Sequence, residues 1–291
     1  MIKLIKTLYL LFHSILIRRL KIVYTKLFSK SLEKCDYSNQ TVLITGAASG
    51  FGRQLAYDFL SLRKRAPKNL ILWDVSPNLF KEFDTGRKNG NTKIFLDQFD
   101  IREQNYNKMQ QLLKNKYSDI NVAILNAGIG VGKPFQTFDT NLLKYFKTME
   151  VNFNANVYAT KYLMEYHSKS IRNVLYMSSA GGYVAAPLMS EYIPSKYAIR
   201  SFAECIAKEY YFKKETRNVS FRVICPYFCR TALLDPMGEK RIKKLPFKVD
   251  IRDVSRACFD SMYYDIDVLV VGWMGYFYKY LYQLVGSDKR M

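Results

Sequence analysis

The sequence predicts an α/β fold, a doubly wound parallel sheet of seven strands with helices on both faces, in a single domain. Seven short runs of β-branched and other apolar residues alternate with longer amphipathic stretches, as expected for strands joined by helical crossovers. In the 291-residue chain, hydrophobic residues make up 49% and charged residues 24%, which suffices for a packed core and argues against intrinsic disorder. Neither an internal repeat nor a low-complexity linker divides the chain.

The seven strands are assigned to the runs in which apolar and β-branched residues dominate. The segments between them are long enough for the crossovers that parallel strands need. The predicted strands are Thr41–Thr45, Asn69–Val75, Thr92–Leu96, Asn121–Leu125, Asn173–Met177, Val219–Cys225 and Val268–Val271.

The charge balance favours an anionic partner, since 45 Lys and Arg against 25 Asp and Glu give a net charge of +20. Basic residues are not interleaved with aromatic residues as in nucleic-acid-binding modules, so no nucleic-acid partner is expected. Five scattered cysteines and only two histidines argue against a metal site and against a disulfide-stapled secreted domain. A reducing compartment fits this cysteine usage.

Residues 1–36 are predicted to form a basic, apolar, membrane-associating segment. Thr7–Ile17 is uncharged and would reach about 16 Å as a helix, too short to span a bilayer core of roughly 30 Å. Basic residues follow where a signal peptide would be cleaved, so we expect the segment to lie in a membrane face with its cations on anionic head groups. The alternative is a helix packed on the protein's own body.

A glycine-rich turn follows the first strand and precedes an amphipathic helical run. Its sequence, TGAASGFG, lets the backbone turn sharply and approach a pyrophosphate, while the helix start offers free N–H groups and a positive dipole end. The strand, turn and helix order predicts dinucleotide binding in a Rossmann-type fold, the alternative being an ordinary tight turn. The cofactor-binding residues assigned here are Thr45, Gly46, Ser49, Gly50, Phe51 and Gly52.

Asp74 closes the second strand, twenty-two residues after Gly52. A carboxylate at this place accepts hydrogen bonds from the adenosine ribose and repels the extra phosphate of NADP, so NAD is expected as the preferred cofactor. The alternative is a surface aspartate that only ends a strand.

Tyr192 and Lys196 stand four residues apart at the start of a predicted helix, with Ser179 thirteen residues before Tyr192. Residues at this spacing share one helix face, so the ammonium is expected to stabilise the phenolate and lower the pKa of Tyr192. A tyrosine with a lowered pKa could serve as a general base. By itself this pair is weak support, because the chain has 23 tyrosines.

Together these motifs resemble the short-chain dehydrogenase/reductase family over roughly Thr41 to Val271. The resemblance implies that Asn152, Ser179, Tyr192 and Lys196 are the catalytic residues, with Ser179 preferred over Ser178. It also implies that Tyr192 and Lys196 contact the cofactor, and it adds to the cofactor-binding residues Asp100, Asn126, Ala127, Gly128, Pro226 and Thr231. One departure is Tyr227, which follows Pro226 where the family usually has glycine.

The resemblance implies hydride-transfer chemistry between NAD and an alcohol. Tyr192 would remove the hydroxyl proton, Ser179 would hydrogen-bond the developing carbonyl oxygen, and Lys196 would bind the nicotinamide ribose. Asn152 would hold a water that relays protons from Lys196.

The predicted substrate is a lipophilic alcohol or its carbonyl compound, such as a retinoid, a steroid or another lipid. The segments expected to build its pocket are residues 232–248, with the basic cluster Lys240, Arg241, Lys243 and Lys244, and the aromatic stretch of residues 272–286. This combination is similar to the membrane-bound retinoid and 17-beta-hydroxysteroid dehydrogenases of the family. The aromatic stretch could instead be a core-packing helix, and the basic cluster a solvated loop.

The expected organisation is a membrane-associating segment over residues 1–36 and an NAD-binding domain over residues 37–291. A homodimer facing the cytoplasm is expected, at the endoplasmic reticulum or on lipid droplets. Two other functions remain open: a nucleotide-binding protein that has lost turnover, and a structural role on a membrane or lipid droplet.

Overall fold

The computed structural model describes residues 31–83, 90, 92–213, 215–216, 218–231, 233 and 248–285. Most of the predicted membrane-associating segment, residues 1–30, lies outside this range. So does the basic cluster of Lys240, Arg241, Lys243 and Lys244.

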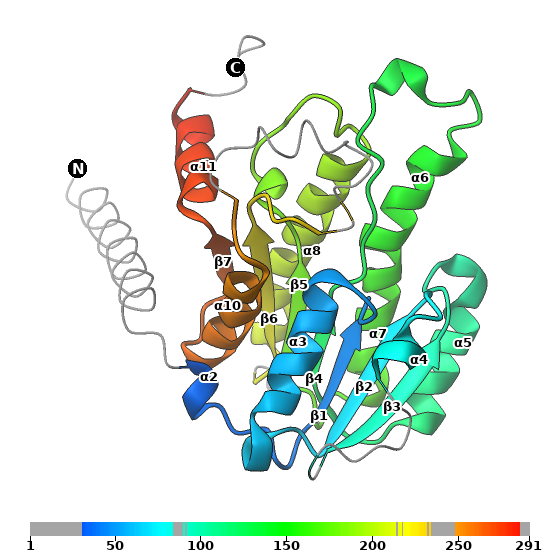
Figure 1. Ribbon diagram of the computed structural model, residues 1–291, viewed down its shortest axis with the longest axis vertical. Coiled ribbons are helices and arrows are strands. Elements are labelled where there is room, and N and C mark those ends of the chain that lie inside the picture. The colour runs from blue at the N-terminus through cyan, green and yellow to red at the C-terminus, as the bar shows by residue number, and fades with distance from the viewer. Residues whose placement is uncertain are drawn as a thin grey trace, which may run out of the picture.

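Seven parallel strands form one sheet in the order β3-β2-β1-β4-β5-β6-β7 (Figure 1). The predicted fold class is confirmed. The strands are β1 Thr41–Thr45, β2 Asn69–Asp74, β3 Lys93–Gln98, β4 Ile120–Leu125, β5 Asn173–Met177, β6 Ser220–Pro226 and β7 Val268–Val271. The chain runs outward from β1 to β3 and then returns to pair β4 with the other side of β1. In sheets with such a reversal, ligands bind at the carboxyl ends of the strands beside it, here β1 and β4.

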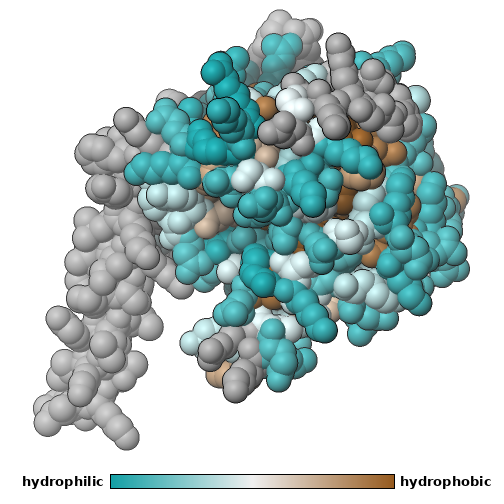
Figure 2. Space-filling model, turned by 90° about the horizontal axis from the view of Figure 1, so that it is seen from below, coloured by the Kyte–Doolittle hydropathy of each residue, from teal (hydrophilic) through white to brown (hydrophobic). Residues whose placement is uncertain are grey.

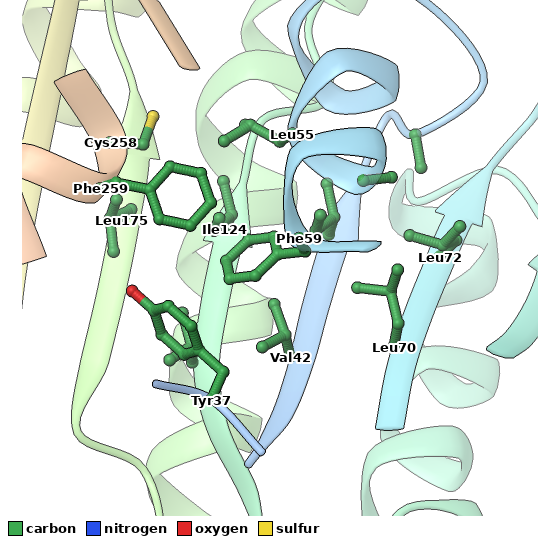
Figure 3. Close-up of a cluster of buried hydrophobic side chains, with 14 of the residues drawn as sticks. Tyr37, Val42, Leu55, Phe59, Leu70, Leu72, Ile124, Leu175, Cys258 and Phe259 are labelled. Atoms are coloured by element: carbon green, nitrogen blue, oxygen red, sulfur yellow. The ribbon is translucent and has the colours of Figure 1, made fainter. Parts of the chain in front are cut away.

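Two hydrophobic cores cover the two faces of the sheet, because successive strand residues point to opposite sides. Val42 and Ile44 belong to one core and Leu43, between them, to the other. In the first core, Phe59 of α3 (Gly50–Ser61) packs on Phe259 of α10 (Ile251–Tyr263) with ring centroids 4.7 Å apart (Figure 3). Each face therefore has its own apolar cover, which holds the strand ends in fixed places.

The helices that cover the sheet come mostly from the long crossovers. The longer ones are α3 Gly50–Ser61, α7 Ala155–Tyr166, α8 Tyr192–Tyr211, α10 Ile251–Tyr263 and α11 Trp273–Val285. The shorter ones are α2 Ser31–Lys34, α4 Leu79–Glu82, α5 Tyr106–Gln111 and α6 Leu143–Met149. A π-helical turn, Glu150–Asn154, joins α6 to α7, so one continuous helical rod carries a local bulge.

β1, β5 and β7 have the predicted bounds, and the other four strands differ from the predicted ones by one or two residues at their ends. β2 stops at Asp74 because the Asp74 carboxylate accepts the Ser76 N–H, which turns the chain away from the sheet. Val75, predicted within the strand, is accordingly exposed. β3 extends to Gln98, paired with Asp74 of β2, which its polar composition did not suggest.

The described surface seen from below in Figure 2 is mostly hydrophilic. Within the described part of the chain, no helix has the length and apolarity needed to cross a membrane. All five cysteines are free. Among the described residues, no cluster of His, Cys, Asp and Glu could hold a metal ion.

Candidate active site

The predicted site residues converge at the carboxyl ends of β1, β4, β5 and β6. Thr45 ends β1, Asn126 follows β4, Ser179 lies two residues after β5, and Pro226 ends β6. Since the carboxyl ends of parallel strands share one sheet edge, the sheet alone brings these residues to one cleft. Tyr192 and Lys196 enter the same region from the first turn of α8.

Thr45 and Asn126 fasten the glycine turn to the segment after β4. The Thr45 Oγ1 accepts the backbone N–H groups of Asn126 at 3.0 Å and Ala127 at 3.1 Å. In return, the Asn126 side-chain amide donates to the carbonyl oxygens of Thr45 and Gly46 at 3.0 and 3.1 Å. These residues set the shape of the turn, and the polar groups of their side chains are largely taken up by hydrogen bonds within the protein.

The turn itself fits a dinucleotide phosphate. Gly46 and Gly50 have φ of +67° and +54°, a conformation that favours glycine, and a Cβ at Gly52 would overlap the Gly46 carbonyl. Helix α3 begins at Gly50, and its N-cap residue Ser49 makes no side-chain capping bond. The first N–H groups of α3 therefore remain open to an anion.

Asp74 faces this turn from the end of β2. One carboxylate oxygen accepts the Ala48 N–H and the other the Ser76 N–H, each at 2.8 Å. The carboxylate thus sits beside the glycine turn, where the ribose of a dinucleotide bound in the turn would lie.

Asp100, expected to contact adenine, forms a two-point ion pair with Arg102. Its Oδ2 accepts from Arg102 Nε at 2.8 Å and Nη2 at 2.6 Å. Burial raises the pKa of Asp100, but the hydrogen bonds and charge of Arg102 outweigh it, so the pKa is lowered overall. The carboxylate stays ionised and held at this edge of the cleft.

Asn152 lies in the π-helical turn, fully buried, and holds the segment after β4. Its Oδ1 accepts the Ile129 N–H at 2.8 Å and its Nδ2 donates to the Ile129 carbonyl at 2.9 Å. The same Nδ2 reaches Ser195 Oγ at 2.9 Å. The bulge gives this side chain its inward direction, a common use of π-turns at functional sites.

Tyr192 is 8% exposed, and the Ser179 hydroxyl lies near enough to its phenol to lower the pKa of that phenol. Ser179 is itself fixed, because its Oγ accepts the Gly181 N–H at 3.1 Å. The predicted serine and tyrosine are thus brought together. Ser178 is occupied elsewhere, since its Oγ donates to the Lys196 carbonyl at 2.8 Å, which supports the choice of Ser179.

The pKa of Tyr192 differs from the sequence-based expectation. Burial raises it to about 12, and this outweighs the lowering effect of the Ser179 hydrogen bond. Lys196, whose ammonium lies 5.4 Å from the centroid of the phenol ring, is not among the groups that shift this pKa, so the expected lowering is not seen.

Lys196 is buried, and its Nζ donates one hydrogen bond, to the Met177 carbonyl at 2.8 Å. Burial lowers its pKa to about 8, so the ammonium still predominates at neutral pH. A Cβ built at Gly128 would be 3.3 Å from both Lys196 Nζ and Asn152 Oδ1. Both side chains therefore border the same small space beside Gly128.

The remaining predicted residues lie around the cleft. A Cβ at Gly50 would be 3.7 Å from Thr231 Cγ2, so Thr231 adjoins the glycine turn. Phe51 is half-buried and packs on the core under α3. The Pro226 carbonyl is 3.5 Å from Ser179 Oγ.

Tyr227, the departure from the family pattern, turns toward α11. Its N–H donates to the Val271 carbonyl at 2.9 Å. A Cβ at Gly272, whose φ is +97°, would be 3.2 Å from Tyr227 Cβ, and one at Gly275 would be 3.6 Å away. The two glycines therefore let the start of the last helix approach the Cβ of Tyr227 closely.

Two residues of the site were not found from the sequence. Gly130 lies on the Tyr192 ring, and Glu191, directly before Tyr192, is a buried carboxylate that binds the segment after β4. The one available signal was an acidic residue beside a candidate base, which is too common to single out.

The sequence matches the family described as short chain dehydrogenase over residues 40–242. It is 30% identical over 215 residues to epidermal retinol dehydrogenase 2 of Mus musculus, covering 72% of this chain and 67% of the relative. It is 28% identical over 214 residues to estradiol 17-beta-dehydrogenase 11 of Homo sapiens, covering 72% and 68%. These matches span about two thirds of each relative's length.

Solved structures share the fold at lower identity. A short chain dehydrogenase/reductase from Burkholderia phymatum in complex with NAD has a TM-score of 0.69 at 20% identity, covering 81% of this chain and 89% of that one. A short chain dehydrogenase from Burkholderia cenocepacia in complex with NADP also has a TM-score of 0.69, at 17% identity, covering 88% and 96%.

Proposed function

The chain belongs to the short-chain dehydrogenase/reductase family and is an NAD(P)-dependent oxidoreductase, and on this basis we propose that it interconverts a lipophilic alcohol and its carbonyl compound through Tyr192, Ser179, Lys196 and Asn152. The observation that carries the proposal is that Ser179, Tyr192 and Lys196 lie close together, with the Lys196 ammonium 5.4 Å from the centroid of the phenol ring, at the sheet edge that also holds the glycine turn. A proton-transfer group and an oxygen-binding hydroxyl thus share one cleft.

The proton chemistry falls to Tyr192 and Ser179. In oxidation the phenolate of Tyr192 takes the alcohol's hydroxyl proton, and in reduction the neutral phenol returns one to the carbonyl oxygen. Ser179 donates a hydrogen bond to that oxygen as its charge changes. Because burial raises the pKa of Tyr192 to about 12, the neutral phenol predominates at pH 7, which suits the reductive direction.

Lys196 and Asn152 support this chemistry from the space beside Gly128. With one donor on Met177, the Lys196 ammonium has further donors for a ribose hydroxyl. Asn152 fixes Ile129, and a water beside its Oδ1 would connect Lys196 to solvent as a proton relay. The 3.3 Å approach of both atoms to the Gly128 position supports this pairing.

The cofactor, when bound, supplies the nicotinamide carbon that exchanges a hydride with the substrate. We propose NAD rather than NADP as the preferred form, because the Asp74 carboxylate faces the glycine turn through its bond to Ala48. Residues Thr45 to Gly52, Asp100, Asn126 to Gly128, Pro226 and Thr231 would complete the cofactor site.

A lipophilic substrate is supported by two relatives named for retinol and estradiol. Exposed apolar side chains are also found on α6 and α11, which both lie at the end of the molecule toward which the strands point (Figure 1). Phe135, Leu143 and Phe146 lie on and before α6, and Trp273 and Phe277 lie on α11, with exposed fractions from 50% to 71%.

We further propose that residues 1–36 associate with a membrane face while residues 37–291 form the catalytic domain. The protein would then work at a cytoplasm-facing membrane, such as the endoplasmic reticulum or a lipid droplet, and draw its substrate from it. Deletion of residues 1–34 should release it from pelleted membranes, and unchanged pelleting would contradict the anchor.

A homodimer is proposed as well, from the pairing of long helices usual in the family. Light scattering of the purified full chain in detergent would show a monomer if this is wrong. The alternative of a nucleotide-binding protein without turnover, acting structurally on a membrane, is not favoured, because the relatives are named as dehydrogenases.

The test of the proposed activity is Tyr192→Phe, which keeps the ring and removes the proton-transfer group. We expect loss of turnover on retinoid, steroid and long-chain alcohols while NAD still raises the melting temperature. The control is Tyr158→Phe, on the exposed side of α7, which should leave turnover unchanged. Retained turnover in Tyr192→Phe would refute the catalytic assignment.

A further inference from the structure

Glu191 is a buried carboxylate next to the candidate base. Its residue is 2% exposed, and it immediately precedes Tyr192 at the start of α8. Burying a carboxylate costs free energy unless hydrogen bonds compensate. Its position therefore calls for an account of what it binds.

One carboxylate oxygen holds the segment that follows β4. Glu191 Oε1 accepts the Val131 N–H at 2.7 Å and the Gly132 N–H at 3.0 Å. The other oxygen, Oε2, has no hydrogen-bond partner among the described residues. One oxygen of Glu191 thus accepts two backbone N–H groups, and the second oxygen is left unsatisfied. A buried oxygen without a partner lowers the free energy of unfolding, so stability alone does not explain this arrangement.

The segment held by Glu191 is the one that packs on Tyr192. A Cβ built at Gly130 would be 3.1 Å from Tyr192 Cδ2, so the backbone of this residue lies directly on the phenol ring. Asn152 fixes the preceding residue, Ile129, through both its N–H and its carbonyl. Gly130 is therefore clamped from both sides, by Asn152 before it and by Glu191 after it.

We propose that Glu191 is a positioning residue for Tyr192, which presses the 129–132 segment against the phenol ring through the Val131 and Gly132 amides. The inference rests on the proposed function, because it concerns the residue that exchanges the proton. Glu191 does not touch the reacting atoms in this account. It holds in place the 129–132 segment, on which the phenol ring packs.

The charge of the Glu191 carboxylate also acts on the pKa of Tyr192. The effect of the charge can therefore be tested separately from the effect of the hydrogen bonds that hold the 129–132 segment. The charged and titratable groups around Tyr192 are Glu191, the Cys225 thiol and the Lys196 ammonium. Burial is the main influence that raises the pKa of Tyr192, and the charges of Cys225 and then Glu191 add to it. Removing the charge while keeping the clamp should therefore lower that pKa, whereas removing the clamp while keeping the charge should not.

Two substitutions make this separation. Glu191→Gln keeps a carbonyl oxygen for the Val131 and Gly132 amides but has no charge. Glu191→Asp keeps the charge, but its side chain is one methylene shorter and cannot reach both amides. The matched control is Glu209→Gln, which removes a carboxylate from the exposed far part of the same helix.

The readouts are the pH profile of kcat/KM for alcohol oxidation and hydrogen exchange of the 129–132 amides in the full chain. For Glu191→Gln we expect the rise of kcat/KM to move to lower pH, with exchange unchanged. For Glu191→Asp we expect the wild-type pH dependence, a lower kcat, and exchange of the Val131 and Gly132 amides faster by about tenfold. Glu209→Gln should match the wild type in both.

The proposal is overturned if Glu191→Asp leaves exchange at 129–132 unchanged, or if both variants lose activity equally with no shift in pH dependence. If Glu191→Gln does not fold, Glu191→Asp still decides through exchange and kcat. Failure of the proposed function looks different: the wild type would then turn over no alcohol, while the exchange results would still report on the clamp.

Discussion

Replacing Thr45 by valine removes the oxygen that joins the glycine turn to the segment after β4, and its cost can be worked out from the contacts. Valine keeps the shape of threonine but offers no acceptor to the Asn126 and Ala127 amides. The Asn126 amide also reaches the Ile124 carbonyl at 3.1 Å, so it keeps a partner. Only the Ala127 amide loses its one acceptor.

The expected loss is therefore one shared hydrogen bond and one unsatisfied amide, together about 2 kcal/mol. Thr45→Ser is the control, because it retains the oxygen and loses only a methyl group. Urea unfolding followed by circular dichroism gives both free energies of unfolding. NAD affinity, measured by calorimetry, should fall in the valine variant by about tenfold and remain near wild type in the serine variant. Equal stabilities of the two variants, within about 0.5 kcal/mol, would refute the reasoning.

Three further outcomes are expected. Asp74→Ala should lower the ratio of kcat/KM for NAD over NADP by about tenfold or more, because it removes the charge beside the glycine turn; an unchanged ratio counts against the NAD assignment. Alcohol oxidation should still increase with pH up to at least about 10, because the base must be deprotonated and burial raises the pKa of Tyr192 to about 12; a plateau below pH 8 would contradict this. Burial lowers the pKa of His167, so the unfolded state takes up a proton first as the pH falls below about 6.5, and stability should be lost from there downward. His167→Gln should flatten that loss in thermal melts at pH 7 and pH 5.

The strands and the shared sheet edge could be predicted because each depends on a local pattern. The run TVLIT is buried at every position as β1, and the glycine turn follows it directly, as expected from its order in the chain. Spacing of four residues correctly placed Tyr192 and Lys196 in the first turns of one helix.

What could not be predicted depends on contacts between distant segments. The pKa of Tyr192 was expected to be lowered, but burial, which no local pattern reports, raises it. The hydrogen bond from the Val131 N–H to Glu191 joins residues that are sixty positions apart in the sequence. The hydrogen bond from the Ala48 N–H to Asp74 likewise becomes visible only in the folded structure. The π-helical turn that orients Asn152 has no sequence signature that separates it from an ordinary helix.

The fit of Tyr227 against Gly272 and Gly275 has a consequence for how this protein can diverge. Any side chain at position 272 would be strained at its φ of +97° and would crowd both Val249 and Tyr227. The atom of Tyr227 in this contact is its Cβ, so a smaller side chain at position 227 would not relieve the crowding, and the closer contact with Val249 would remain. Position 272 is therefore expected to stay glycine among descendants of this sequence, whichever side chain follows Pro226, and a designer can vary residue 227 more freely than residue 272.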